Sequence, residues 1–485
     1  MVMKMYQKPT NQISLFESYK HFIGARLDPE NRWVKTAELI PWDIIEEKYM
    51  ALFQSHTGNV AKPVRMALGA LIIKEKYGYS DEETVEQLKE NPYYQYFIGL
   101  SGFQSRAPFD ASTMTLFRKR ITLEAIKEVN AYICGKKKRD DDSDPNGGVS
   151  SGSSPKLTGI VEENKGNLIL DATCAPADIH YPTDLSLLNE AREKLETMVD
   201  RLHENQKGSE EKPRTYRKKA RQAYLRVEKK KKPTWQEIRR ALRKQLGFIA
   251  RNIRIVSELL KKYPQGLSRR QLQDLETILK LFDQQKYMYE NRTHQVENRI
   301  VSIHQPHVRP IVRGKKTAEV EFGAKVAISL VGGYAEIEKL SWDAFNEGNT
   351  LVASIEAYKA RHGYYPAKVI ADKIYRNREN LRFCEGKGIH LHGPRLGRPN
   401  KDLKVQAAQR KQEIEEAGIR NGVEGKFGEG KRIYGLNRIM ARLKETSETV
   451  IGLQFLVMNL GKRLRDLLCK LLECLLSEQF ELVAI

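Results

Sequence analysis

The chain is poor in cysteine and has no long apolar run. Its five cysteines are scattered and form no Cys-x-x-Cys pair, which argues against zinc and disulfides and predicts reduced, packed thiols. The longest apolar stretch, residues 450–460, is too short to span a bilayer and is followed by basic residues. The N-terminus lacks the apolar core of a secretory signal. These absences predict a cytoplasmic protein that does not reside in a membrane.

Negative charge is also in short supply. The 485 residues include 83 Lys and Arg against 62 Asp and Glu, a net charge of +21. A surplus of this size favours polyanions through phosphate contacts and counterion release. The basic residues cluster between 212 and 254, with aromatic residues interleaved. We predict nucleic-acid contact in this segment, including Lys218 and Lys219, although an exposed charged helix would have the same composition.

The first part of the chain, from about 42 to 130, has the pattern of short helices. One is expected from Pro63 to about Gly78, and a second after the capping-box sequence Ser80–Glu83. A third is expected to run from Ser112 to Ile121. Such helices suit a helix-turn-helix DNA reader, and equally any small helical bundle. On the first interpretation the third helix binds DNA through Arg118, Lys119 and Arg120.

Residues 136–158 are charged and then rich in Gly and Ser, which predicts a flexible linker. A strand is expected next, over 166–171, and then a long helical stretch over 185–302 that is broken at Pro233 and at 263–266. Strands resume at 323, with a hairpin at Gly332-Gly333, because both central residues of a type I′ turn need positive φ. This order of strands and helices predicts an α/β fold, with a mixed sheet covered by helices.

The C-terminal part continues the pattern. A helix is expected over 351–362, strands over 368–371 and 389–392, and helices to the end of the chain. The final helix has a leucine stripe that predicts a core face, with an oligomer face as the alternative. The stripe comprises Leu464, Leu467, Leu468, Leu471, Leu472, Leu475 and Leu476.

Three carboxylates stand out by their positions. Asp171 and Asp372 each follow a short apolar run, so that a buried strand would hold the side chain at the rim of a sheet. Glu424 lies on a helical pattern with Arg420 and Lys431 on the same face. Oxygen ligands from two strands and a helix suit a pair of hard divalent cations, which can support phosphoryl transfer. Taken singly, each residue has an ordinary alternative, a turn-capping aspartate or a salt-bridged helix surface.

Other residues compete with these candidates. Asp178 and Asp184 lie near Asp171, and Asp184 is better placed to cap the following helix. The histidines are expected to pack or to contact DNA rather than to bind Mg, which prefers oxygen. Four glycines between 422 and 430 make the segment around Glu424 a poor helix by propensity, although glycine would allow close approach of the backbone to DNA.

The order of several sequence blocks resembles the DDE transposases of bacterial insertion sequences, with an InsH-like N-terminal domain. The first blocks are 74–100 and 112–120, followed by Leu168-Ile-Leu-Asp171 with Tyr181-Pro-Thr-Asp184, Val312-Arg-Gly-Lys315 and Glu321–Lys325. The later blocks are Ala371-Asp372-Lys-Ile-Tyr375 and Arg420-x3-Glu424-x6-Lys431, with Tyr434-Gly-Leu436 and Ala441-Arg-Leu443. The last signature departs from the family at its tyrosine position, which is Ala417 here.

The resemblance implies a ribonuclease-H-like catalytic core in which Asp171, Asp372 and Glu424 bind Mg, with Mn as a possible substitute. It also implies that Arg420 and Lys431 contact DNA, that transposon ends and target DNA are the partners, and that a homodimer or larger assembly acts in the nucleoid. The expected activity is cleavage at element ends followed by strand transfer. The alternatives are a ribonuclease-H-like nuclease without strand transfer and a DNA-binding protein whose catalytic core has decayed.

The same resemblance predicts a division of the chain. A helical DNA-binding domain would occupy 1–135 and the linker 136–158. The catalytic core would comprise 159–184 and 303–485, interrupted after its first strand by a basic helical insertion over 185–302.

Overall fold

The computed structural model describes residues 27–53, 60–135, 163–204, 210–315, 318–393 and 403–483. The chain forms two compact units. Unit 1 comprises Met1–Ala175, Val326–Leu340 and Phe345–Ile485, and unit 2 comprises Pro176–Lys325 and Ser341–Ala344. The predicted linker lies outside the described residues, and the division into an N-terminal domain, core and insertion stays a prediction.

Unit 1 begins with short helices. The expected helix after Pro63 is α4, which ends at Gly78 with φ of +69°, a value that glycine adopts without strain. The hydroxyl oxygen of Ser80 accepts a hydrogen bond from the Glu83 amide at 3.0 Å and so caps the N-terminus of α5. The predicted basic helix is α7, and all three predictions are confirmed. The helices are α2 (Arg32–Leu39), α3 (Trp42–Met50), α4 (Val64–Tyr77), α5 (Asp81–Glu90), α6 (Pro92–Phe97), α7 (Thr113–Arg120) and α8 (Leu123–Ile133).

The sheet is mixed, with the strand order β2-β3-β1-β5-β6, and β4 also pairs with β3. β1 and β5 are parallel, as are β5 and β6, whereas β2 and β3 are antiparallel. The predicted hairpin joins β3 to β4, where Gly332 and Gly333 have φ of +57° and +81°. β2 was not predicted. The strands are β1 (Asn167–Pro176), β2 (Arg309–Lys315), β3 (Ala318–Val331), β4 (Tyr334–Ser341), β5 (Lys368–Ile370) and β6 (His390–Leu391).

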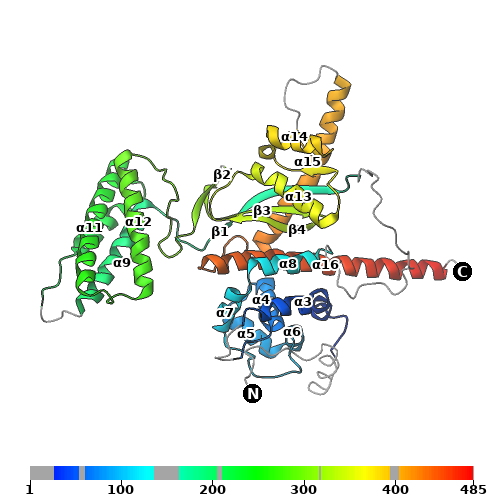
Figure 1. The fold of residues 1–485 in the computed structure, drawn as a ribbon, viewed down its shortest axis with the longest axis horizontal. Helices are drawn as coiled ribbons and strands as arrows, with labels where there is room; N and C mark the ends of the chain where they lie inside the picture. The colour runs from blue at the N-terminus through cyan, green and yellow to red at the C-terminus, as the bar shows by residue number, and fades with distance from the viewer. Residues whose placement is uncertain are drawn as a thin grey trace, which may run out of the picture. The chain divides into compact units, whose positions relative to one another are not determined.

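Helices cover both faces of the sheet in unit 1 (Figure 1). Leu168, Leu170 and Val369 share one core with α13 (Leu351–His362) and α14 (Arg378–Gly386). Because side chains alternate along a strand, Ile169, Asp171 and Ile370 point to the other face. There α15 (Leu403–Ile433) packs against β5.

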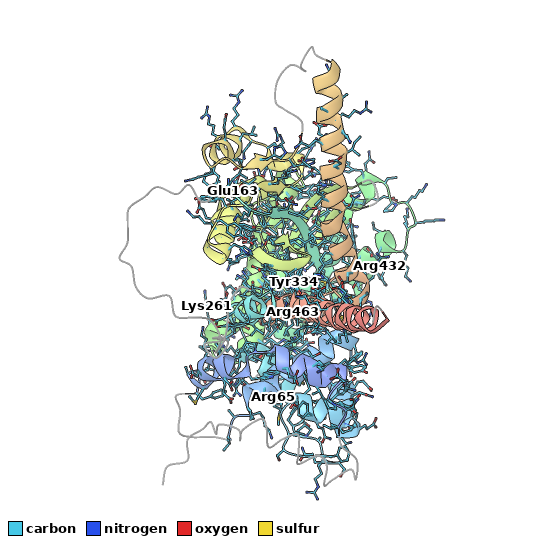
Figure 2. The ribbon with its side chains drawn as sticks, turned by 90° about the vertical axis from the view of Figure 1, so that its right-hand side faces the viewer. Arg65, Glu163, Lys261, Tyr334, Arg432 and Arg463 are labelled. Atoms are coloured by element: carbon cyan, nitrogen blue, oxygen red, sulfur yellow. The ribbon has the colours of Figure 1, made fainter. Side chains whose placement is uncertain are left out.

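The long C-terminal helix α16 (Lys444–Val483) packs against α4, α7 and α8. Its first half is buried throughout residues 450–460. Farther along, Tyr334 donates a hydrogen bond to Asp466 at 2.6 Å, and Figure 2 shows Tyr334 beside Arg463. Leu467 and Leu468 are exposed, so the prediction of a core face is wrong for these two leucines, because the helix runs past the elements that cover its first half. The side chains of Leu471, Leu472, Leu475 and Leu476 lie outside the described set.

Unit 2 is built around three helices that share an apolar core. Leu195 and Leu202 of α9, Ile249 and Val256 of α11 and Ile278 of α12 are among its buried members. Figure 1 shows these helices packed side by side. The predicted breaks at Pro233 and 263–266 are confirmed, and a further break before α10 was not foreseen. The helices are α9 (Asp184–Glu204), α10 (Arg217–Glu228), α11 (Trp235–Lys262) and α12 (Arg269–Asn291).

Candidate active site

The pairing of β1 with β5 brings two of the predicted aspartates together. Ile169 is paired with Ile370, and Asp171 and Asp372 each lie two residues farther along in the same parallel register. One expectation is wrong: Asp171 does not end its strand, since β1 continues to Pro176. The small and β-branched residues after Asp171 suit a buried strand, and they are buried. It is the partner strand β5 that ends at Ile370, which leaves both carboxylates at the rim on that side.

The third carboxylate and its neighbouring arginine come from α15. The guanidinium of Arg420 lies 3.4 Å from Asp372 and 3.0 Å from Glu424. About half of each carboxylate side chain is exposed, 54% for Asp372 and 57% for Glu424. Arg420 therefore links the helix to the end of β5 and lies between two of the three predicted ligands.

The segment around Glu424 is a regular helix despite its four glycines. The reason is packing: a Cβ at Gly422 would lie 3.7 Å from Leu330 of β3, and one at Gly430 would lie 3.2 Å from Leu436 and 3.3 Å from Met458. The contact at Gly422 would be an ordinary van der Waals contact, whereas a side chain at Gly430 would be crowded, so Gly430 lets α15 approach α16 closely. The helix predicted around Glu424 is therefore confirmed despite its low propensity, because burial of Val423 and Phe427 outweighs that cost.

Asp171 lies in an environment that disfavours its charge. Burial raises the pKa of its carboxyl to about 6. The charges of Glu347 and Asp372 act in the same direction, whereas the Ala172 amide and Arg420 oppose them. Burial and the same group of carboxylates, with Glu347 foremost, also raise the pKa of Tyr375. Glu347, in the 3-10 turn η1 (Glu347–Thr350), is thus a fourth acid whose charge acts on this region.

The donor set fits a divalent cation in its chemistry. Asp171, Asp372 and Glu424 supply only oxygen atoms, the ligands that hard cations prefer. Together these carboxylates give the site a negative charge, which Arg420 partly neutralises. In the part of the chain that the structure describes, no three Asp, Glu, His or Cys side chains are grouped closely enough to hold a metal ion. In this structure Asp372 and Glu424 are each paired with Arg420.

The remaining predicted DNA contacts belong to three different helices. Lys431 lies in the last turn of α15, seven residues and about 10 Å beyond Glu424. Arg118 is held in a bidentate pair with Asp81, at 2.6 and 2.8 Å. On the same helix Lys119 is exposed, and Arg120 stacks on the ring of Phe53 at 4.8 Å. Lys218 and Lys219 are exposed on α10 of unit 2.

A buried acid anchors α15 one turn before Arg420. The carboxylate of Glu416 lies 2.7 Å from His392 Nδ1 and 3.0 Å from His390 Nε2, and it accepts a bond from Gln412 at 2.9 Å. Although burial raises its pKa, these hydrogen bonds lower it to about 2. The two histidines thus pack against α15, which is one of the roles expected for them.

Sequence reasoning missed Glu347, Tyr375 and Glu416. Glu347 and Tyr375 belong to short 3-10 turns, for which the sequence has no periodic signal. The only available sign for Tyr375 was its place in the block Ala371–Tyr375. Glu416 lies among several acids of a polar helix, and nothing in the sequence marks it as the buried one.

Comparisons with known proteins identify the family of the chain. Residues 369–461, which include Asp372 and Glu424, match a family described as "Transposase DDE domain", and residues 21–120 match "Transposase domain (DUF772)". A curated relative, "Uncharacterized protein ORF8 in nfe locus" of Rhizobium meliloti, is 31% identical over 178 residues, which is 36% of this chain and 77% of that protein. No solved structure matches the chain significantly. The chain belongs to the DDE transposases of bacterial insertion sequences.

Proposed function

We propose that this transposase hydrolyses the phosphodiester at each end of its element and then joins the freed 3′ hydroxyl to target DNA. Asp171, Asp372 and Glu424 are the proposed catalytic residues. The observation that carries the proposal is the parallel register of β1 and β5, which sets Asp171 level with Asp372 while Arg420 links Asp372 to Glu424. The proposed core is ribonuclease-H-like, on the strength of the mixed sheet with helices on both faces.

The three carboxylates would hold Mg, or Mn in its place. Bound divalent cations would stabilise charge on the attacking and leaving oxygens of an in-line displacement. The chain supplies the positions: β1 fixes Asp171 in a buried strand, and α15 carries Glu424 on a helix anchored through Glu416. In the proposed DNA complex Arg420 exchanges its carboxylate partners for phosphate oxygens. The planar guanidinium group can donate two hydrogen bonds to one phosphate. Lys431 would contact the backbone farther along the same helix.

No covalent enzyme intermediate is required, because water and then a DNA hydroxyl act as nucleophiles. In the first step water replaces the 3′ oxygen at phosphorus, and in the second the freed hydroxyl displaces a bridging oxygen of the target strand. One phosphodiester forms for each one broken in the second step. Two element ends must meet, so we expect a homodimer or larger assembly on DNA.

The test is cleavage of labelled duplex carrying the element ends, with and without Mg, by the wild-type chain and the Glu424→Gln variant. We expect the wild-type chain to cut at the element boundary only when Mg is present. The cleavage rate of the variant should be at least 100-fold lower, which is the order of loss when a group that stabilises the transition state is removed. Glu415→Gln is the matched control, since Glu415 is exposed on the same helix. Both variants should bind the duplex as well as the wild type.

Three other outcomes separate the alternatives. Full cleavage by Glu424→Gln would rule out the assigned ligand. Cutting without joined products would identify a nuclease without strand transfer. Binding without cleavage in either Mg or Mn would identify a decayed catalytic core that retains DNA binding.

A further inference from the structure

The helix α11 of unit 2 has one strongly basic face. Between residues 238 and 257 it contains six Arg and Lys and no Asp or Glu. On its opposite face Leu246, Ile249 and Val256 are buried in the core of unit 2. Five of these cations are exposed on the side of the helix that faces away from that core, whereas Arg239 is half-buried and donates a hydrogen bond to the Tyr289 carbonyl at 3.0 Å.

Five of the exposed residues follow helical spacing along this face. Arg240, Arg243, Lys244, Gly247 and Arg251 are all exposed and, with Phe248, line a shallow open groove. We call these residues the basic groove. Its first and last cations are 11 residues apart, which is about 16 Å along a helix. One strand of B-DNA carries about five phosphates over that length.

The cations of the basic groove differ from other cations of unit 2 in their partners. Elsewhere in unit 2, Lys212 and Arg217 pair with Asp200, and Lys230 pairs with Glu237. Within the described residues, no ion pair joins an acid to a cation of the basic groove. Arg251 is instead oriented by the ring of Tyr216, which lies 4.5 Å from its guanidinium carbon. An uncompensated row of cations attracts a polyanion more strongly than a salt-bridged surface does.

The glycine in the middle of the groove, Gly247, packs against no side chain of the residues that the structure describes. A Cβ at Gly247 would meet no atom within 4 Å, yet glycine costs about 1 kcal/mol relative to alanine inside a helix. A missing side chain on an exposed helix face allows a ligand's backbone to come close. Gly247 is flanked by Arg243 and Lys244 on one side and Arg251 on the other, so a phosphate strand could lie across it between cations.

We propose that the basic groove of α11 binds the phosphate backbone of duplex DNA without regard to sequence. The choice of DNA as the polyanion rests on the proposed function, whereas the location of the surface rests on the residues of α11. This surface lies within the segment 212–254 for which the sequence predicts nucleic-acid contact, but on α11 and not on α10, which carries Lys218 and Lys219. It gives unit 2 a role in holding DNA during transposition.

The first test compares two fourfold variants of the full chain. One carries Arg240→Gln, Arg243→Gln, Lys244→Gln and Arg251→Gln, and the control carries Lys261→Gln, Arg269→Gln, Arg270→Gln and Lys286→Gln. Both remove four positive charges from exposed positions of unit 2, and Lys261 is labelled in Figure 2. Binding to a random-sequence duplex is measured by fluorescence anisotropy from 50 to 300 mM KCl.

The slope of log K against log salt is negative, and each lost phosphate contact reduces its magnitude by about 0.9. The slope of the groove variant should therefore be smaller in magnitude by about 3 to 4. We also expect at least tenfold weaker binding at 100 mM salt, while the control keeps nearly the wild-type slope. Equal slopes for the two variants would overturn the proposal. So would a clear preference of the groove for duplex RNA.

A second pair of variants keeps every cation. Gly247→Glu and Gly247→Gln add side chains of the same size at a position with open space, so both should fold as the wild type does. We expect Gly247→Glu to weaken DNA binding several-fold and Gly247→Gln to weaken it less. Identical affinities for the two would contradict the proposal even if the fourfold variant were unstable.

These outcomes are separable from those of the cleavage test. If the groove variants bind DNA as well as the wild type does, and cleavage still depends on Glu424, only the proposal for the basic groove is refuted. A chain that binds through the groove but never cuts would refute the catalytic proposal alone.

Discussion

At the scale of single residues, Asp171 is the most informative position. Its strand is buried, its neighbours Glu347 and Asp372 are acidic, and its pKa is raised from 3.8 to about 6. Such a perturbation by burial and like charge is typical of functional carboxylates, although structural networks can also produce it. The negative charge on Asp171 therefore lowers the stability of the folded chain when no cation is bound.

This cost predicts how stability depends on pH. Because the pKa is higher in the folded chain, the folded state binds the proton more tightly than the unfolded state does. The penalty is absent below about pH 4, grows as the pH rises to about 6, and is complete above that pH. Asp171→Asn should raise the free energy of unfolding by about 2 to 3 kcal/mol at pH 7 without divalent cations. Its advantage should vanish near pH 4.

Urea unfolding of both chains at pH 4, 5, 6 and 7, in the presence of a chelator, measures this difference. Glu415→Gln serves as a control at an exposed position and should change little at any pH. A constant advantage of Asp171→Asn across the range would show that charge burial is not its cause.

At the scale of elements, α15 decides whether the three carboxylates can meet. The helix is anchored near its middle by Glu416 with His390 and His392, and near its end by the close approach of Gly430 to Met458. The glycines of one helix therefore have different roles. A Cβ at Gly425 would meet nothing within 4 Å, whereas one at Gly430 would be crowded.

These roles predict opposite effects of two substitutions in α15. Gly425→Ala should stabilise the chain by about 1 kcal/mol, because alanine has the better helix propensity and the site is open. Gly430→Val should destabilise it by about 1 to 3 kcal/mol through overpacking against Leu436 and Met458. Thermal unfolding followed by circular dichroism measures both. A stabilising Gly430→Val would show that α15 does not approach α16 as closely as described.

At the scale of the whole molecule, unit 1 joins segments that are far apart in the sequence. Asn459 of α16 donates hydrogen bonds to Asn130 of α8 at 2.7 Å and to the Ala335 carbonyl of β4 at 2.6 Å. The side-chain oxygen Oδ1 of Asn459 accepts a hydrogen bond from the Ala335 amide at 3.0 Å, and the Asn459 side chain is fully buried. One amide thus ties the N-terminal helices, the sheet and the C-terminal helix together.

Loss of this amide should therefore weaken the whole unit. Asn459→Ala leaves the buried groups of Asn130 and Ala335 with fewer partners, and we expect it to lower the free energy of unfolding by about 1 to 3 kcal/mol. The exposed Asn437→Ala is the control. Denaturant titration of Asn459→Ala, Asn130→Ala and the double variant should give non-additive losses, since the two side chains share one network. Additive losses would mean that the two residues act independently.

No helix among the described residues is long and apolar enough to cross a membrane. The longest apolar stretch, residues 450–460, is instead the buried half of α16, which packs against the N-terminal helices. Its apolar character serves the assembly of unit 1.

Several elements could be predicted because their signals are local. Gly78 ends α4, Ser80 opens α5 and the Gly332-Gly333 pair turns β3 into β4, because caps and turns depend on the conformations of a few consecutive residues. Other features depend on residues that are distant in the sequence and could be seen only in the fold. The fold extends β1 beyond Asp171, keeps the glycine-rich α15 helical, and selects Glu416 for burial and Glu347 as a neighbour of Asp171. Burial and close packing against segments tens to hundreds of residues away outweigh local propensity at these positions.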